Sequence, residues 1–158
     1  MPGAEDLVVF DRDAVVGVGV YKSVLAMVWH GPPTVEHLRA LGGHQQRVAD
    51  LHPRGFVTLA VLPSQHTRMS PEVRGAAEEL ARNPSPALVA VAQVITGNGF
   101  VAASTRMIAA GLALLGRTPT KLFASSDAAA LWLCERAATI PEAPAIHPDE
   151  LIAAIAAL

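Results

Sequence analysis

The chain has 158 residues, of which 51% are hydrophobic and 16% charged, a composition that is typical of one folded domain and excludes intrinsic disorder. Its formal net charge of −2 gives no electrostatic attraction to nucleic acid, so we expect no nucleic-acid partner. The single cysteine, Cys134, excludes an internal disulfide and a multi-cysteine zinc site.

The sequence predicts neither a membrane span nor a secretion signal. No apolar run reaches the ~18 residues of a membrane span, and Arg106 interrupts the most apolar segment, residues 101–115. The chain does not open with a basic stretch followed by an apolar core, so we expect no signal peptide. We therefore predict a cytoplasmic protein without a membrane span.

Two short strands are predicted first, at residues 7–10 and 15–20. Residues 24–29 form a further β-rich run, which the sequence HGPP ends, so the chain opens with two or three strands. A helix follows Pro33, with Thr34 as its N-cap. Its apolar residues fall at spacings compatible with one face: Val35, Leu38, Leu41, Val48 and Leu51. We expect Gly42-Gly43 to weaken and bend this helix in its middle.

The middle of the chain alternates strand and helix. Residues 56–62 predict a strand, and SPEVRGAAEELAR predicts a helix with Ser70 as its cap and Pro71 at its first position. Its apolar stripe comprises Val73, Ala76, Ala77 and Leu80. Residues 87–95 are apolar without alternation, as in a parallel strand that helices cover on both faces.

Further elements complete the chain. Residues 100–115 predict a helix with an inward stripe at Phe100, Ala103, Met107, Ile108, Gly111 and Leu115. A short strand at 120–124 precedes a helix that we expect Ser126 to cap. A Pro-rich tether then leads to an amphipathic tail helix, which can dock on its own domain or on a second copy of the chain. The apolar face of that helix comprises Leu151, Ile152, Ile155 and Leu158.

This order predicts an α/β fold: a mostly parallel sheet with antiparallel opening strands, alternating βα units and an extra C-terminal helix. We divide the chain into an α/β domain, residues 1–140, and the tether with its amphipathic helix, residues 141–158.

Two stretches carry a resemblance to a known family. VLAMVWHGPPTVEHLRAL joins a strand to the first helix through a Trp-His-Gly turn, and LFASSDAAALWL joins a short strand to a Ser-capped helix. With ITGNGFVAASTR as the third strand-to-helix junction, residues 14–138 resemble the STAS or SpoIIAA-like fold of bacterial anti-sigma-factor antagonists. The resemblance implies a bacterial regulatory protein that acts through protein-protein contacts.

The same resemblance implies a phosphorylation site at the start of the second helix, where the family carries an Asp-Ser motif followed by Gly. Here the junction reads LPSQHTRMSPEV, so Ser64 and Ser70 lie in the right region, but no Asp precedes either one and no Gly follows. Ser70 is better explained as an N-cap.

The Gly97-Asn98-Gly99 turn is the candidate ligand site. Backbone N–H groups at a helix N-terminus favour anions, and Arg106 lies two turns into the helix. The Lys of a P-loop and the third Gly of a dinucleotide fingerprint are both missing. Two interpretations stay open: a tight strand-to-helix corner, or a weak anion or ligand site.

The histidines are candidate metal ligands. His30, His37 and His44 are seven residues apart, which is not the spacing of a metalloprotease helix, so we expect no metal. His30 follows a strand end, a place that often lines a ligand crevice, and we retain it as a tentative binding residue.

Catalytic signatures are missing from the sequence. It contains no Gly-x-Ser-x-Gly elbow, and Cys134 lies inside a predicted helix. We predict a non-enzymatic regulatory or scaffold domain without a cofactor, with a protein partner that can be a second copy. The alternative is a carrier of a small apolar or anionic ligand, with apolar helix residues around its pocket and His30 or the Gly97–Gly99 turn near the mouth. An enzyme would need a crevice that joins His30 or residues 64–70 to distant groups.

Overall fold

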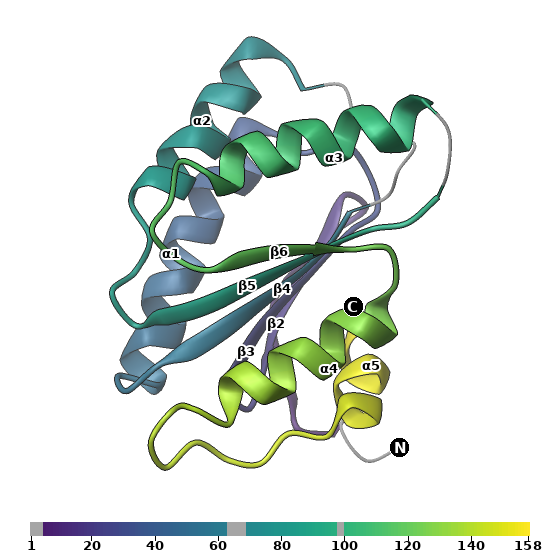
Figure 1. Ribbon diagram of the computed structural model, residues 1–158. Helices are drawn as coiled ribbons and strands as arrows, with labels where there is room; N and C mark the ends of the chain where they lie inside the picture. Colours follow the sequence, from purple (N-terminus) through teal and green to yellow (C-terminus); the bar gives the residue numbers. More distant parts are fainter. Residues whose placement is uncertain (1–4, 63–68, 98–99) are drawn as a thin grey trace.

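The computed structural model describes residues 5–62, 69–97 and 100–158, the side chains of Phe100 and Val101 excepted (Figure 1). Its strands are β1 (Leu7–Arg12), β2 (Val16–Tyr21), β3 (Val24–Trp29), β4 (Phe56–Leu62), β5 (Leu88–Ile95) and β6 (Thr120–Phe123). They form one sheet in sequential order, antiparallel from β1 to β3 and parallel from β3 to β6. The predicted α/β class, with its antiparallel opening strands, is confirmed.

The helices are α1 (Val35–Leu51), α2 (Pro71–Arg82), α3 (Phe100–Ala113), α4 (Ser126–Ala137) and α5 (Pro148–Ile155). From β3 onward, each strand adds to the same side of its predecessor, so right-handed crossovers bring α1, α2 and α3 to one face of the sheet. Helices α4 and α5 cover the other face (Figure 1). Strand β5 therefore lies between two parallel neighbours with helices over both faces, as predicted. Among the described residues, no helix is long and apolar enough to cross a membrane.

Strand β4 shows how the two hydrophobic layers arise. Its side chains alternate, so Val57 and Leu59 pack in the layer under α4 and α5, while Phe56 and Ala60 pack in the layer under α1 and α2. The same alternation turns Thr58 toward the face that α1, α2 and α3 cover. A hydroxyl is thus placed in a layer of mostly apolar side chains.

Helix α1 departs from its prediction in two ways. It runs unbroken through Gly42 and Gly43, so the expected bend was wrong. Leu51 is 58% exposed, whereas Leu38 and Val48 are buried as expected. At 3.6 residues per turn, the last helical residue is rotated by about 100° from the centre of the buried face. The apolar face therefore ends one turn before the helix does.

Helix α3 presents a different face from the one predicted. Ala102, Thr105 and Ala109 are buried, whereas Met107 is 77% exposed. Three other members of the predicted stripe, Ala103, Gly111 and Leu115, are also exposed, and Leu115 lies beyond the helix end. The helix is apolar on almost every side, so its periodicity could not indicate which side faces the sheet.

The helix caps follow local chemistry. Thr34 and Ser70 cap α1 and α2 as predicted, by accepting the backbone N–H of His37 and Val73 respectively. Helix α4 is capped by Ser125, which accepts from Ala128, and not by Ser126. The predicted cap was displaced by one residue because two adjacent serines satisfy the same pattern.

The tail helix docks on its own domain. Leu151 is fully buried in the hydrophobic layer that contains α4, and Leu158 is 5% exposed there. Arg12 Nη2 donates to the backbone oxygen of Ala157 at 2.6 Å. A side chain at Gly17 would overlap the backbone of Leu158, so the close approach of strand and tail requires glycine there.

Candidate ligand-binding cavity

A cavity of about 190 Å³ lies between the sheet and helices α1, α2 and α3. Strands β3 to β6 form its floor, with Met27, Ala60 and Val91 among the floor residues. Leu80 of α2 and Leu112 of α3 belong to the cover. The enclosure is therefore built from elements that lie far apart in the sequence.

Small side chains explain why space remains here. Ala60 on β4, Ala77 on α2, and Ala109 and Ala113 on α3 all line the cavity, and each side chain ends at Cβ. Protein interiors are otherwise packed as densely as organic crystals. Alanine on three facing elements thus leaves a volume that no protein atom fills.

The described residues of the lining carry no formal charge. No Asp, Glu, Lys, Arg or His is among the described residues that line it. The polar lining residues are Gln45, Thr58, Gln93, Thr105, Thr118 and Thr120. The Thr120 hydroxyl donates to the backbone oxygen of Thr118 at 3.1 Å, so that hydroxyl is satisfied within the protein.

Thr58 and Gln93 are different, because each has a buried polar atom without a hydrogen-bond partner in the protein. Thr58 is 3% exposed and its Oγ1 is unpartnered, as is Oε1 of Gln93. Leaving a buried polar group unpaired costs about 1–3 kcal/mol. Such groups are few in native structures, and each one calls for an explanation, such as a functional role or a bound water or ion.

Sequence reasoning missed both residues. It treated 56–62 and 87–95 simply as apolar strands. The available signal was the single Thr in FVTLAVL and the single Gln in LVAVAQVI, since both strands were expected to be buried. A lone polar residue in a strand covered on both faces has to meet a polar partner or line a cavity.

Of the predicted Gly97-Asn98-Gly99 site and Arg106, the structure describes Gly97 and Arg106, which are not lining residues of this cavity. Arg106 Nη2 donates to the backbone oxygens of Ile95 at 3.0 Å and Gly97 at 2.8 Å, and neither Gly97 nor Arg106 lines the cavity. Gly97 has a positive φ of 94°. These contacts favour the tight-corner interpretation, in which Arg106 closes the turn. Asn98 and Gly99 lie outside the described residues.

The other tentative site residues have local partners. His30 Nε2 lies 3.1 Å from the backbone oxygen of Leu158, and His30 is not part of the lining, although Trp29 and Gly31 on either side of it are. Ser70 Oγ accepts the Val73 N–H at 3.2 Å. Ser64 lies outside the described residues.

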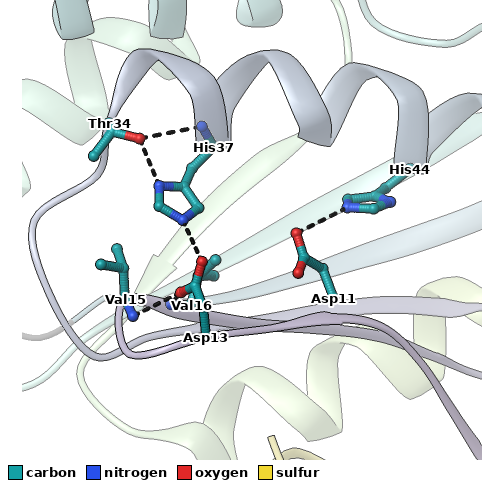
Figure 2. A network of polar contacts seen from close by, with 7 residues as sticks. All are labelled: Asp11, Asp13, Val15, Val16, Thr34, His37 and His44. Atoms are coloured by element: carbon teal, nitrogen blue, oxygen red, sulfur yellow. Dashed lines mark hydrogen bonds and ion pairs between the residues drawn. The ribbon is translucent and has the colours of Figure 1, made fainter.

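A polar network joins the β1–β2 turn to α1 (Figure 2). His37 Nδ1 lies 2.5 Å from Thr34 Oγ1, and His37 Nε2 lies 2.7 Å from Asp13 Oδ2. Asp13 Oδ1 also accepts from the backbone N–H of Val15 and Val16. The hydrogen bond to His37, followed by these backbone bonds, lowers the pKa of Asp13 to about 2.

Hydroxyl, imidazole and carboxylate follow one another here in the order found in hydrolase triads. However, Thr34 Oγ1 also accepts the His37 backbone N–H as the N-cap of α1, and none of the three residues lines the cavity. A triad requires a substrate pocket beside the nucleophile. The network is therefore a link between the β1–β2 turn and the start of α1.

His37 and His44 share one face of α1, because the helix is straight where a bend was expected (Figure 2). His44 Nε2 lies 3.9 Å from Asp11 Oδ2. Burial lowers the pKa of His44 despite this carboxylate. Within the described ranges, no group of three His, Cys, Asp or Glu side chains is placed to hold a metal ion.

Cys134 is half-buried on α4, and burial raises the pKa of its thiol to about 11. A raised thiol pKa disfavours the reactive thiolate.

Comparisons of the chain with protein-family models, with curated proteins and with solved structures gave no match. The cavity is therefore interpreted from its own chemistry.

Proposed function

We propose that this protein is a non-enzymatic binding domain that holds a small molecule in the cavity between its sheet and helices α1, α2 and α3. The observation that carries the proposal is a mostly apolar enclosure containing unpartnered polar atoms of Thr58 and Gln93. Ligand sites in proteins are mostly apolar concavities with a few placed polar groups. The ligand-carrier interpretation of the sequence thus ranks first.

The cavity volume supports this proposal. A buried cavity of about 150 Å³ in another protein binds benzene, and this one measures about 190 Å³.

A matched pair of α3 variants tests the proposal. Ala109→Leu adds a side chain to the cavity lining, whereas Ala110→Leu adds the same side chain to the exposed surface of the same helix. We expect benzene to raise the melting temperature of the wild type and of Ala110→Leu, because a ligand that binds only the folded state stabilises it. Ala109→Leu should lose this response. If neither benzene nor phenol changes the melting temperature of the wild type, the proposal is contradicted.

A role through protein contacts is the second candidate, and the outer face of α3 favours it. Met107 is 77% and Leu114 87% exposed; Met107 lies on α3 together with the exposed Ala110 and Gly111, and Leu114 directly follows the last residue of the helix. A two-fold axis through the small residues would pack Met107 of one copy against Leu114 of the other, so the proposed partner is a second copy of this chain.

Light scattering tests the second candidate. The wild type should form dimers that the double variant Met107→Gln/Leu114→Gln does not form, and a wild-type monomer at all concentrations would exclude it. The STAS-like assignment, and the regulatory role that it implies, belong with this candidate. Both stay predictions.

A further inference from the structure

We infer that the ligand is a small uncharged molecule with an apolar body and one hydroxyl group, of the alcohol or phenol class, and that its hydroxyl binds Gln93 and Thr58. This inference rests on the proposed function, and it names the chemistry of the ligand. Three properties of the lining lead to it: its lack of charge, the kind of polar atom left unpaired, and the place of these atoms in the sheet.

The described lining offers no opposite charge to an ionised ligand. A buried charge needs an opposite charge or several hydrogen bonds to replace its hydration. No described lining residue has an ionisable acidic or basic side chain, and the guanidinium of Arg106 is engaged by the carbonyls of Ile95 and Gly97. Of the apolar and anionic ligands that the sequence left open, the cavity favours the neutral one.

The unpaired atoms indicate what the ligand has to offer. Gln93 Oε1 is an acceptor only, so its partner must be a donor. The Thr58 hydroxyl both donates and accepts. A ligand hydroxyl, which also does both, satisfies either residue, whereas a pure hydrocarbon satisfies neither and an ether or ketone cannot serve Gln93.

The sheet register places the two groups together. Thr58 pairs with Val91 and Ala60 pairs with Gln93 on the neighbouring parallel strand, so Thr58 and Gln93 are diagonal neighbours on the same face. The two unpartnered polar atoms of the lining therefore lie on neighbouring strands of the floor, β4 and β5. The cover opposite contains Leu80, Ile108 and Leu112, and it suits the apolar body of the ligand.

Three probes of similar size separate the alternatives: benzene, phenol and benzoate. Trp29 lines the cavity and is 4% exposed, and the only other tryptophan is Trp132, so the Trp132→Phe protein has a single fluorescent reporter in the cavity. At neutral pH, we expect phenol to bind about tenfold more tightly than benzene, since one hydrogen bond contributes about 1–1.5 kcal/mol. Benzoate should not bind.

Variants then assign the preference to the two residues. Gln93→Leu and Thr58→Val, each in the Trp132→Phe background, should retain benzene binding and lose most of the preference for phenol. Ser23→Ala is the matched control, because Ser23 Oγ is also buried and unpartnered but is outside the cavity lining. That control should keep the full preference.

The outcomes distinguish this inference from the proposed function. If none of the probes binds, the proposed function fails. If benzene binds as tightly as phenol, or benzoate binds most tightly, the cavity is a binding site but the inferred ligand class is wrong. The phenol-to-benzene comparison requires neither cavity variant, so it decides the question even where Gln93→Leu does not fold.

Discussion

The hydroxyl of Tyr21 donates a 2.6 Å hydrogen bond to Glu150, which lies 129 residues further along the chain on the tail helix. Lys22 Nζ lies 3.6 Å from the same carboxylate. The hydrogen bond from Tyr21 lowers the pKa of Glu150, while burial and this carboxylate raise the pKa of Tyr21. Strand β2 is thus tied to α5 by a bond to a charged group.

Tyr21→Phe tests the strength of this tie. The variant keeps the buried ring and removes the donor, so we expect the free energy of unfolding to fall by about 1–2 kcal/mol in urea titrations. The matched control is Thr139→Val, which removes an exposed hydroxyl that bonds only within its own turn. An equal loss in both variants would show that the tie to α5 contributes nothing beyond a local bond.

Alanine substitutions at two glycines are expected to change the stability of the protein in opposite directions. Gly17→Ala places a methyl group against the backbone of Leu158, so the tail must shift and stability should fall. Gly42→Ala lies inside α1 with nothing within 4 Å of the added methyl group, so the variant should gain about 0.5–1 kcal/mol from helix propensity alone. Thermal unfolding of both variants measures these changes. Stabilisation by Gly17→Ala would mean that the tail does not lie where it is described.

The stability that Asp13 contributes is expected to depend on pH in the acidic range. Its folded-state pKa of about 2 lies below its ordinary value of 3.8, so its contribution to stability is present above pH 3.8 and is lost as the pH falls toward 2. Asp13→Asn should therefore be less stable than the wild type at neutral pH, and the difference should vanish at the acidic end. Repeating the pH series with His37→Gln tests whether the two residues act as a pair. A difference that persists unchanged below pH 2 would contradict the assignment.

Thr58→Val is expected to stabilise the ligand-free protein. Valine has nearly the same shape and removes an unpaired buried hydroxyl, so the free energy of unfolding should rise by about 1 kcal/mol. Thr120→Val is the matched control: its hydroxyl is paired with Thr118, and its removal should destabilise. Native proteins accept such unfavourable groups at binding sites, where stability is exchanged for function. Destabilisation by Thr58→Val would show that the hydroxyl has a partner inside the protein.

The local parts of this fold were readable from the sequence. Ser70 and Pro71 mark the start of α2 by capping chemistry, and the unbroken apolar run of 87–95 indicates a strand buried on both faces. The buried face of α3 could not be predicted, because Met107 and Ala109 lie on a helix that is apolar on almost every side. Short-range patterns determine where elements begin and end, but not which side of such a helix is buried.

The candidate site was less predictable for a physical reason. A cavity is the volume that facing side chains fail to fill, and Ala60 and Ala109 meet across it from positions far apart in the chain. A local sequence pattern cannot predict that two such distant residues line the same cavity. The Gly97 turn and Arg106, which have the local pattern of an anion site, instead bond to each other.

A crystal structure of the protein soaked with phenol tests the central claim most directly. The account predicts a phenol ring between Ala60 and Ala109, with its hydroxyl about 2.6–3.0 Å from Gln93 Oε1. Side chains from α3 packed directly onto β4 and β5, with no space for a ring between them, would contradict it.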